Sequence, residues 1–185
     1  MIDLTGKKVT YYGYTGLIDS ASVTKICAAL NIAANNKQDN IYLCLSSPGG
    51  FVADGIFLYN HIRSLAVPVI IHATGTIASI ATAVFVAAPT RYSSKNAMFM
   101  MHPTTVGPFN QGIAAEQIQS ALNSAVADDE RTERILRDRT KLSDEILKAK
   151  RLRDVHLSPD EALKFGLVDE IGEFAIPAGQ QLFQI

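Results

Sequence analysis

The sequence predicts a single α/β domain over residues 1–185, with a largely parallel sheet covered by helices. Short apolar runs of β-type residues alternate with segments whose apolar residues recur at helical spacing. This order is typical of parallel strands connected through helices. In addition, 185 residues of which 48% are hydrophobic suit one well-filled core, and no Gly/Ser-rich or Pro-rich linker divides them.

The first half of the chain contains most of the predicted strands. They are expected over residues 8–12, 41–45, 67–73, 90–93 and 97–102. Helices are expected between them, one capped by Asp19 or Ser20, one over about 52–64, and one over 79–88 after a turn at Gly75. The last of these is strongly apolar, so we expect a buried helix that begins directly after a buried strand.

One long predicted helix, over about 112–140, dominates the second half of the chain. Its apolar residues Ile118, Leu122 and Val126 form only a thin stripe, and the stretch from Asp128 to Arg139 is heavily charged. The charged stretch predicts a solvated face. The thin stripe predicts that the helix projects from the domain and packs against another subunit.

A short helix and a final strand are predicted near the end. Ser158 supplies an N-cap, Pro159 suits the first helical position, and Glu161 completes a capping box. Gly166 suits the C-terminal cap of this helix. A strand over 167–171 is expected to close the core.

Composition excludes several classes of function. The net charge is −1 and 19% of residues are charged, so nothing attracts the chain to nucleic acid or to an anionic membrane. The apolar region 65–88 is interrupted by polar residues and does not suit a membrane span, and we expect no secretory leader. Cys27 and Cys44 have no metal-ligand or disulfide spacing. We therefore expect a cytoplasmic protein that uses no metal and no cofactor.

Ser79 is the first candidate for catalysis, because it stands where a buried strand turns into a buried helix. Unpaired backbone N–H groups at such a helix start favour developing negative charge. On position alone, however, a serine here is a helix cap. The Gly-x-Ser-x-Gly elbow of α/β-hydrolases is also absent.

The turn Ser47-Pro-Gly-Gly50 makes catalysis more plausible. Its two glycines allow close approach of the backbone and positive φ angles. An N–H group from this turn, together with the N–H of Ile80, would form an oxyanion hole with two donors. Taken alone, the glycines favour an ordinary strand-to-helix turn.

His102 and Asp154 are the candidates for the base and its orienting carboxylate. His102 ends a predicted strand, and α/β folds open their clefts at the carboxyl ends of strands. His61, His72 and His156 are comparable in isolation. Asp154 would fix the imidazole tautomer if it were buried beside the histidine, and otherwise forms a surface ion pair.

Taken in order, these segments resemble the Clp protease proteolytic subunit (ClpP) family over nearly the whole chain, from about Val9 to Ile171. The matching segments are Ile41-Tyr-Leu-Cys-Leu-Ser-Ser-Pro-Gly-Gly50, Gly75-Thr-Ile-Ala-Ser79, Met98-Phe-Met-Met-His102-Pro103, Arg153-Asp154-Val-His-Leu-Ser158, and Glu161-Ala162 through Phe165-Gly-Leu-Val-Asp169. Several such segments in the right order make the resemblance specific.

The resemblance implies the fold and the site. The fold would be the ClpP/crotonase-like repeated ββα fold with a projecting handle helix, the handle region covering about 103–142. The site would be a serine endopeptidase triad of Ser79, His102 and Asp154, with Gly50 and Ile80 as oxyanion donors and no metal.

The resemblance also implies a substrate and an assembly. An extended peptide or unfolded protein would add itself as a strand between Gly49–Gly50 and a handle strand that includes Thr104. The family forms a homo-oligomeric chamber, as a heptamer or a stacked double heptamer.

Several residues depart from the family pattern. Ile80-Ala81 follow the serine where Met-Gly is usual, Pro103 follows the histidine directly, and Leu152 replaces a usual acidic residue. At the face where the family docks a hexameric AAA+ ATPase, Tyr42 and Tyr92 remain. Smaller or polar residues stand elsewhere on that face, namely Cys44, Ser64, Thr74 and Ser94. We therefore expect a divergent member that works without the usual ATPase or with a different one.

Two other functions stay open. A crotonase-like acyl-CoA enzyme shares the fold and the two-amide oxyanion hole. It would normally require carboxylates near that hole that act as general acid and base. A catalytically weak or scaffold subunit of a mixed ring would keep the fold without the chemistry, and such subunits commonly lose a triad residue.

Overall fold

A single eight-stranded sheet organises the computed structural model, which describes residues 4–107 and 112–185. The main path through the sheet is β6-β5-β3-β2-β1-β8. Its centre consists of β1 (Val9–Thr15), β2 (Asn40–Ser47) and β3 (Val69–Ala78), which pair in parallel. The edge strand β8 (Leu182–Gln184) adds to β1, also in parallel.

The far side of β3 is shared by two strands. The first half of β3 pairs with β4 (Thr90–Ser93) and its second half with β5 (Met98–Met101). Outside them lie β7 (Glu170–Ile171) beside β4 and β6 (Val155–Leu157) beside β5. The β5–β6 pair is antiparallel, so β6 runs beside β5 in the opposite direction.

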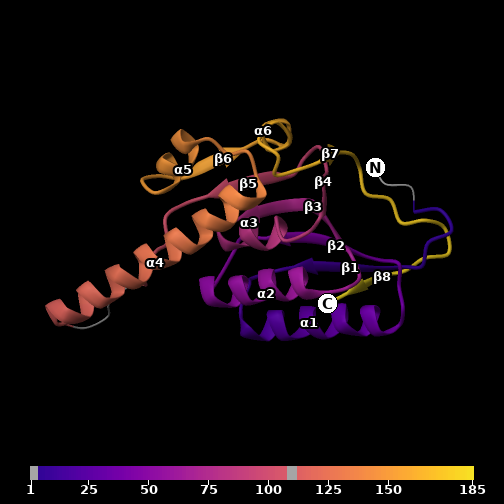
Figure 1. Ribbon diagram of the computed structural model, residues 1–185, viewed down its shortest axis with the longest axis horizontal. Helices are drawn as coiled ribbons and strands as arrows, with labels where there is room; N and C mark the ends of the chain where they lie inside the picture. The colour runs from indigo at the N-terminus through magenta and orange to yellow at the C-terminus, as the bar shows by residue number, and fades with distance from the viewer. Residues whose placement is uncertain (1–3, 108–111) are drawn as a thin grey trace.

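The alternation of side chains along the strands separates two apolar clusters. The residues Ile41, Leu43 and Leu45 of β2 face the larger core, which includes α1 (Ser20–Asn35), α2 (Val52–Ser64) and α3 (Ile80–Phe85). On the opposite face, Tyr42 and Cys44 join a smaller aromatic cluster. In Figure 1, α1 and α2 cover one side of the β1–β3 sheet.

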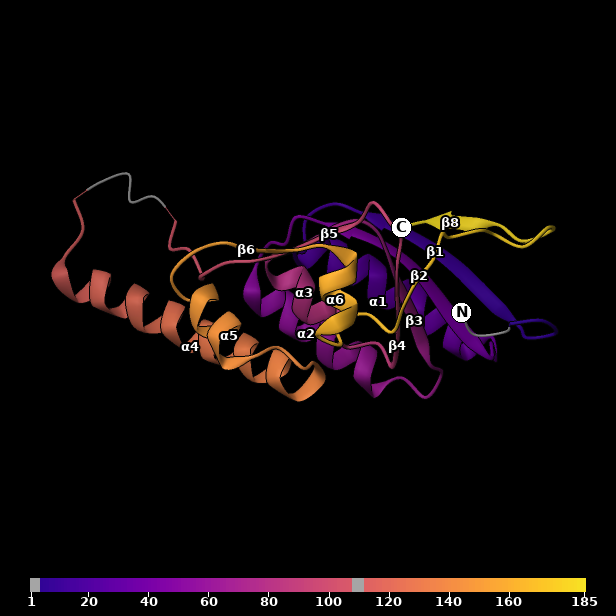
Figure 2. The same cartoon turned by 90° about the horizontal axis from the view of Figure 1, so that it is seen from above.

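The helix α4 (Ala115–Arg139) extends well beyond this body (Figures 1 and 2). Its 25 residues correspond to a length of ~37 Å. Only its C-terminal part packs on the body, where Thr132, Glu133 and Leu136 are buried. After it come α5 (Asp144–Lys150) and, following β6, the short helix α6 (Pro159–Lys164).

The structure confirms the alternating α/β order and several local predictions. Asp19 caps α1, α2 has the expected bounds, and Ser158 and Glu161 form the capping box of α6. Gly166 has a φ of +67°, as a C-cap glycine requires. Gly166 is therefore difficult to replace with a residue that has a side chain.

The prediction of a turn at Gly75 was wrong. β3 continues through Gly75 to Ala78. The glycine is needed for another reason, since a Cβ added at this position would lie 2.5 Å from the Ser46 Oγ. Gly75 thus allows a close contact between β3 and β2. The elements α5, β6 and β8 were not predicted.

Helices formed by the described residues are all too short or too polar to cross a lipid bilayer.

Candidate active site

Ser79 has a backbone conformation that residues with a side chain rarely adopt. Its φ is +57° and its ψ −131°, at the junction between β3 and α3. Such conformations cost about 1–3 kcal/mol and occur where surrounding structure enforces them. Here the Ser79 N–H donates to the Met100 carbonyl at 2.8 Å, and the Ser79 carbonyl accepts from Thr82. Ser79 occupies the N-cap position of α3, as its place in the sequence predicts, but its hydroxyl makes no capping hydrogen bond.

The Gly49–Gly50 turn lies directly against this serine. Gly49 has a φ of +101°, and a Cβ built on it would lie 2.5 Å from the Ser79 Cβ. The backbone groups of Gly49 are used within the turn, since its N–H donates to the Ser47 hydroxyl and its carbonyl accepts from Ile18.

Gly50 is different, because its N–H group does not take part in these bonds. It forms a parallel bridge with Ile18 in which the donors are the N–H groups of Ile18 and Phe51. In such a bridge the N–H and C=O of the middle residue, Gly50, point the other way. A Cβ on Gly50 would lie 2.1 Å from the Ile18 carbonyl oxygen, so only glycine allows this approach. Within the described part of the chain, the free N–H of the turn therefore belongs to Gly50.

One pocket brings together most of the residues predicted for the site. It has a volume of about 200 Å³ and lies between the Gly50 turn, the start of α3, the end of β5 and the base of α4. The predicted site residues in its lining are Gly50, Ser79, Ile80, His102 and Thr104. The apolar part of its wall comes from Phe51, Val52, Met101 and Leu136.

Asp154 does not line this pocket. The antiparallel register of β5 and β6 pairs Met101 with Val155. Continued by one step, this register places His102 opposite Asp154. No hydrogen bond joins Ser79 to His102, or His102 to Asp154, in the part of the chain that the structure describes, and Asp154 is exposed. The three residues are thus neighbours by topology without being bonded.

The described part of the expected handle strand does not form a regular strand. Residues 102–107 follow β5 without forming a strand, and residues 108–111 lie outside the described part. Thr104, predicted to bind substrate, instead donates its N–H and its hydroxyl to Asp129, each at 3.0 Å. The Thr104 N–H is therefore occupied within the chain.

With this geometry in place, comparison with known proteins identifies the family. A family model described as Clp protease matches residues 10–174. The chain belongs to the Clp protease family. ATP-dependent Clp protease proteolytic subunit 2 of Pseudomonas aeruginosa is 32% identical over 166 residues, which cover 89% of this chain and 81% of that protein.

A solved structure shows the same fold. A ClpP1 mutant from Listeria monocytogenes superposes with a TM-score of 0.78 at 24% sequence identity, covering 90% of this chain and 92% of that chain. The ClpP-like fold class predicted from the sequence is confirmed by this match.

In this member of the Clp protease family, the sequence reasoning missed three charged residues of the pocket wall, Asp128, Asp129 and Lys150. Asp129 and Lys150 both line the pocket, and the Lys150 Nζ lies 3.0 Å from the Asp129 Oδ1. Burial alone would raise the pKa of Asp129, but the bond and charge of Lys150 and the two bonds from Thr104 outweigh it and lower this pKa. Asp129 is therefore ionised in the native protein near neutral pH.

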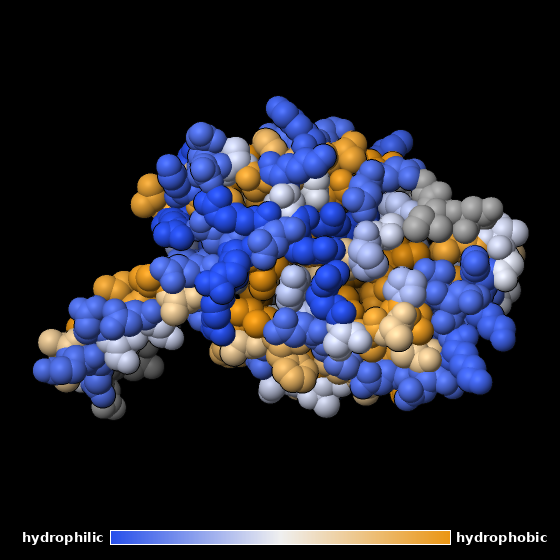
Figure 3. Space-filling view, in the orientation of Figure 1, coloured by the Kyte–Doolittle hydropathy of each residue, from blue (hydrophilic) through white to orange (hydrophobic). Residues whose placement is uncertain are grey.

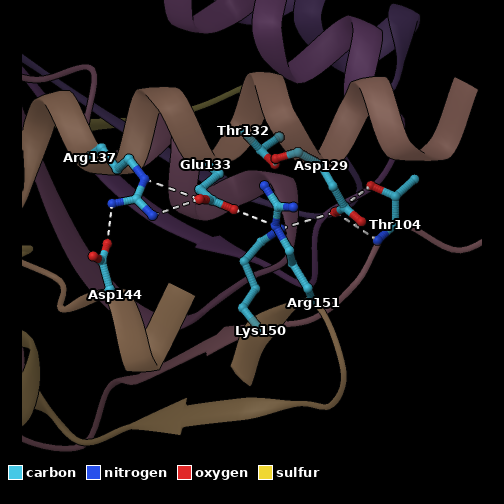
Figure 4. A network of polar contacts seen from close by, with 8 residues as sticks. All are labelled: Thr104, Asp129, Thr132, Glu133, Arg137, Asp144, Lys150 and Arg151. Carbon is cyan, nitrogen blue, oxygen red and sulfur yellow. Dashed lines mark hydrogen bonds and ion pairs between the residues drawn. The ribbon is translucent and has the colours of Figure 1, made fainter. Parts of the chain in front are cut away.

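The prediction of a solvated face for Asp128–Arg139 was accordingly wrong in part. Figure 4 shows that Asp129, Glu133 and Arg137 of α4 face α5. Glu133 is buried and accepts hydrogen bonds from Arg137 and Arg151, and Arg137 also binds Asp144. Both arginines lower the pKa of Glu133 against the opposing effect of burial. A run of alternating charges did not reveal which of its residues turn inward.

Across the described residues, no group of three or more His, Cys, Asp or Glu side chains is arranged to hold a metal ion. The pocket offers a serine, a histidine and backbone N–H groups, with the Asp129–Lys150 ion pair in its wall.

Proposed function

We propose that this chain is a serine endopeptidase subunit, with Ser79 as nucleophile, His102 as general base and Asp154 as the residue that orients the base. The observation that carries the proposal is the conformation of Ser79. Its backbone is held at a φ of +57°, its hydroxyl makes no capping bond, and the residue lines the same pocket as His102. Backbone strain at a strand-to-helix junction is the device by which hydrolases expose a nucleophilic serine.

The proposed reaction uses groups that the pocket already contains. The Ser79 Oγ attacks the carbonyl carbon of a peptide bond while its proton passes to the His102 imidazole. The tetrahedral intermediate then collapses, the C–N bond breaks, and the leaving amine takes the proton from His102. Water, deprotonated by the same imidazole, releases the acyl group from Ser79 and restores the hydroxyl.

Gly50 and Ile80 would stabilise the negative charge that develops on the carbonyl oxygen. The Gly50 N–H is not used by the bridge to Ile18. The N–H of Ile80 is that of the first residue of α3, which has no partner within the helix. Two such donors stabilise the oxyanion far more strongly in a site shielded from water than in bulk solvent. Loss of one typically lowers kcat by about 10²–10³-fold.

The substrate proposed is an extended peptide or unfolded chain. Gly50 presents a free backbone edge beside Ser79, which suits pairing with a peptide strand. Since the Thr104 N–H is bonded to Asp129, the second side of the substrate channel would have to come from elsewhere or from a rearranged Thr104. Pairing through the backbone predicts broad tolerance of side chains.

Assembly into a homo-oligomeric chamber is proposed from the projecting helix. Ile118, Leu122 and Val126 lie four residues apart along α4, and each is about half exposed. Figure 3 shows apolar surface along this projecting end. A stripe of this kind requires a partner surface, and the family suggests another copy of the chain, in heptameric or stacked heptameric rings.

Partnership with an ATPase unfoldase is a separate proposal. The relative from Pseudomonas aeruginosa is named as part of an ATP-dependent protease. In this chain the aromatic residues Tyr42 and Tyr92 are buried, and the ring of Phe174 packs on Tyr42 at a centroid distance of 5.3 Å. This packing supports a member that works without the usual AAA+ ATPase. Stimulated degradation of a folded protein by a Clp-type ATPase would contradict it.

Hydrolysis of short fluorogenic peptides tests the proposed chemistry. The assembled wild type should cleave them, and Ser79→Ala and His102→Ala should each reduce the rate to background while the mass in solution stays unchanged. Wild-type turnover by Ser79→Ala would refute the assignment of the nucleophile.

A scaffold subunit is the second candidate, favoured by the absence of hydrogen bonds between Ser79, His102 and Asp154. Catalytic hydrogen bonds are often loose before substrate binds, so an inactive site does not follow from this geometry. A scaffold would assemble normally and cleave peptides no faster than Ser79→Ala, and it would still be expected to raise the activity of a mixed ring.

A further inference from the structure

A single carboxylate oxygen at the base of α4 connects the two segments that carry His102 and Asp154. The Asp129 Oδ1 accepts the N–H of Thr104, the hydroxyl of Thr104 and the ammonium group of Lys150, each at 3.0 Å (Figure 4). The side chains of Asp129 and Lys150 are only 17% and 6% exposed. This is therefore an interior contact that solvent screens weakly.

Each donor is close in sequence to a residue of the proposed triad. Thr104 follows His102 by two residues, and Lys150 precedes Asp154 by four. The segment from Lys150 to Asp154 is a tight turn at the end of α5, in which the N–H groups of Leu152 and Arg153 both donate to the Ala149 carbonyl at 2.9 Å. Movement of Lys150 is thus transmitted to Asp154.

The opposite ends of these segments are fixed by the sheet. The last residue pair of β5 and β6 on this side is Met101 with Val155. The sheet therefore fixes the register up to the residues next to His102 and Asp154. Beyond these residues no strand pairing continues. On the far side of His102, the shared bonds to Asp129 join the two segments.

We propose that Asp129, together with Lys150, is a positioning residue that holds the His102 segment against the Asp154 segment in the geometry that activates Ser79. It acts through these two residues and takes no part in bond making. This inference rests on the peptidase function proposed above. It also gives α4 a role in the chemistry, because the helix that carries the exposed stripe provides the carboxylate.

The variant Asp129→Asn tests the inference, since it keeps the shape and one acceptor oxygen but removes the charge that holds Lys150. With a short peptide substrate, we expect kcat to fall about 10- to 100-fold, as a displacement of the order of 1 Å would cause, while KM changes little. The rate of labelling of Ser79 by a fluorophosphonate should fall in parallel, because labelling also needs an activated serine.

The end point of labelling separates positioning from partial unfolding. A population that is partly unfolded labels incompletely, whereas a mispositioned site labels completely but slowly. Asp144→Asn is the matched control. It removes one negative charge from the outer end of the same network, where Asp144 binds Arg137 and, among the described residues, makes no bond to Asp129, Thr104 or Lys150, and we expect wild-type kcat and labelling rate.

A gentler variant covers the case in which Asp129→Asn fails to fold or assemble. Thr104→Val removes one of the three bonds and leaves the ion pair intact, and we expect a fall in kcat of about threefold to tenfold with complete labelling. Wild-type kcat and labelling rate in both variants, with Ser79→Ala inactive, would overturn the positioning role and leave the peptidase intact. Wild-type turnover by Ser79→Ala would instead refute the proposed function itself.

Discussion

Gly49→Ala is the substitution whose effect on Ser79 can be worked out most directly. A Cβ at this position would lie 2.5 Å from the Ser79 Cβ, 2.9 Å from the Ala78 carbonyl oxygen and 3.1 Å from the Ser79 Oγ. Ordinary contact begins at 3.4 Å, so the neighbouring atoms must move by about 1 Å. Two of the three atoms that the methyl group meets belong to the proposed nucleophile.

The expected cost has two parts. The φ of +101° is unfavourable for alanine, which together with the overlap should lower the free energy of unfolding by about 1–3 kcal/mol. Displacement of the serine by about 1 Å should lower kcat/KM for a short peptide by about 10²-fold. Peptide hydrolysis by the folded variant, with thermal unfolding measured in parallel, gives both numbers.

Gly112→Ala is the control, since a Cβ there meets no atom within 4 Å and the backbone needs no positive φ. Wild-type kcat/KM in Gly49→Ala would refute the view that this turn holds Ser79 in place, even if the variant were less stable.

Three further predictions concern assembly and stability. Leu122→Asp places a charge in the exposed stripe of α4, and its mass in solution should be that of smaller species while circular dichroism stays native; an unchanged mass would exclude the stripe from assembly. Arg139→Met removes the hydrogen bonds of Arg139 to the buried carbonyls of Val86 and Ala88, and should cost about 3 kcal/mol in denaturant unfolding. An unchanged denaturation midpoint would show that these carbonyls need no such partner. Because the folded-state pKa of Asp129 is lowered, its stabilising effect is complete above its unfolded pKa, near 4, and is lost as the pH falls through the lower folded value. Asp129→Asn should therefore unfold less steeply in acid than the wild type, and equal slopes would contradict this.

The sequence predicted what depends on local patterns. The order of strands and helices, the capping box at Ser158 and the full extent of α2 all follow from propensities and caps within a few residues. The pocket residues Gly50, Ser79, Ile80 and His102 were candidates because they lie at strand ends and turns, where α/β folds place chemistry, and the resemblance to the ClpP family selected them.

Features that depend on distant contacts escaped prediction. Gly75 was interpreted as a turn residue, but the contact that requires it is with Ser46 on the neighbouring strand. Asp129 and Glu133 were interpreted as solvated, because burial of a charge in α4 depends on partners from α5 and on Thr104. The strand β8 pairs with β1 at the opposite end of the chain, a contact that no local pattern encodes.

The positive φ of Ser79 could not have been predicted from the sequence either. A serine before an apolar helix is ordinarily its cap, and here the cap geometry is replaced by a conformation that β5 and the glycine turn enforce. The feature that distinguishes Ser79 from an ordinary capping serine therefore depends on the tertiary structure.

Covalent labelling of the assembled protein with a fluorophosphonate, followed by peptide mass mapping, tests the central claim most directly. The account predicts one adduct per chain, located on Ser79, with loss of peptide hydrolysis in proportion to labelling and no adduct in His102→Ala on the same time scale. An unlabelled Ser79 in folded, assembled protein, or full hydrolytic activity after complete labelling, would contradict it.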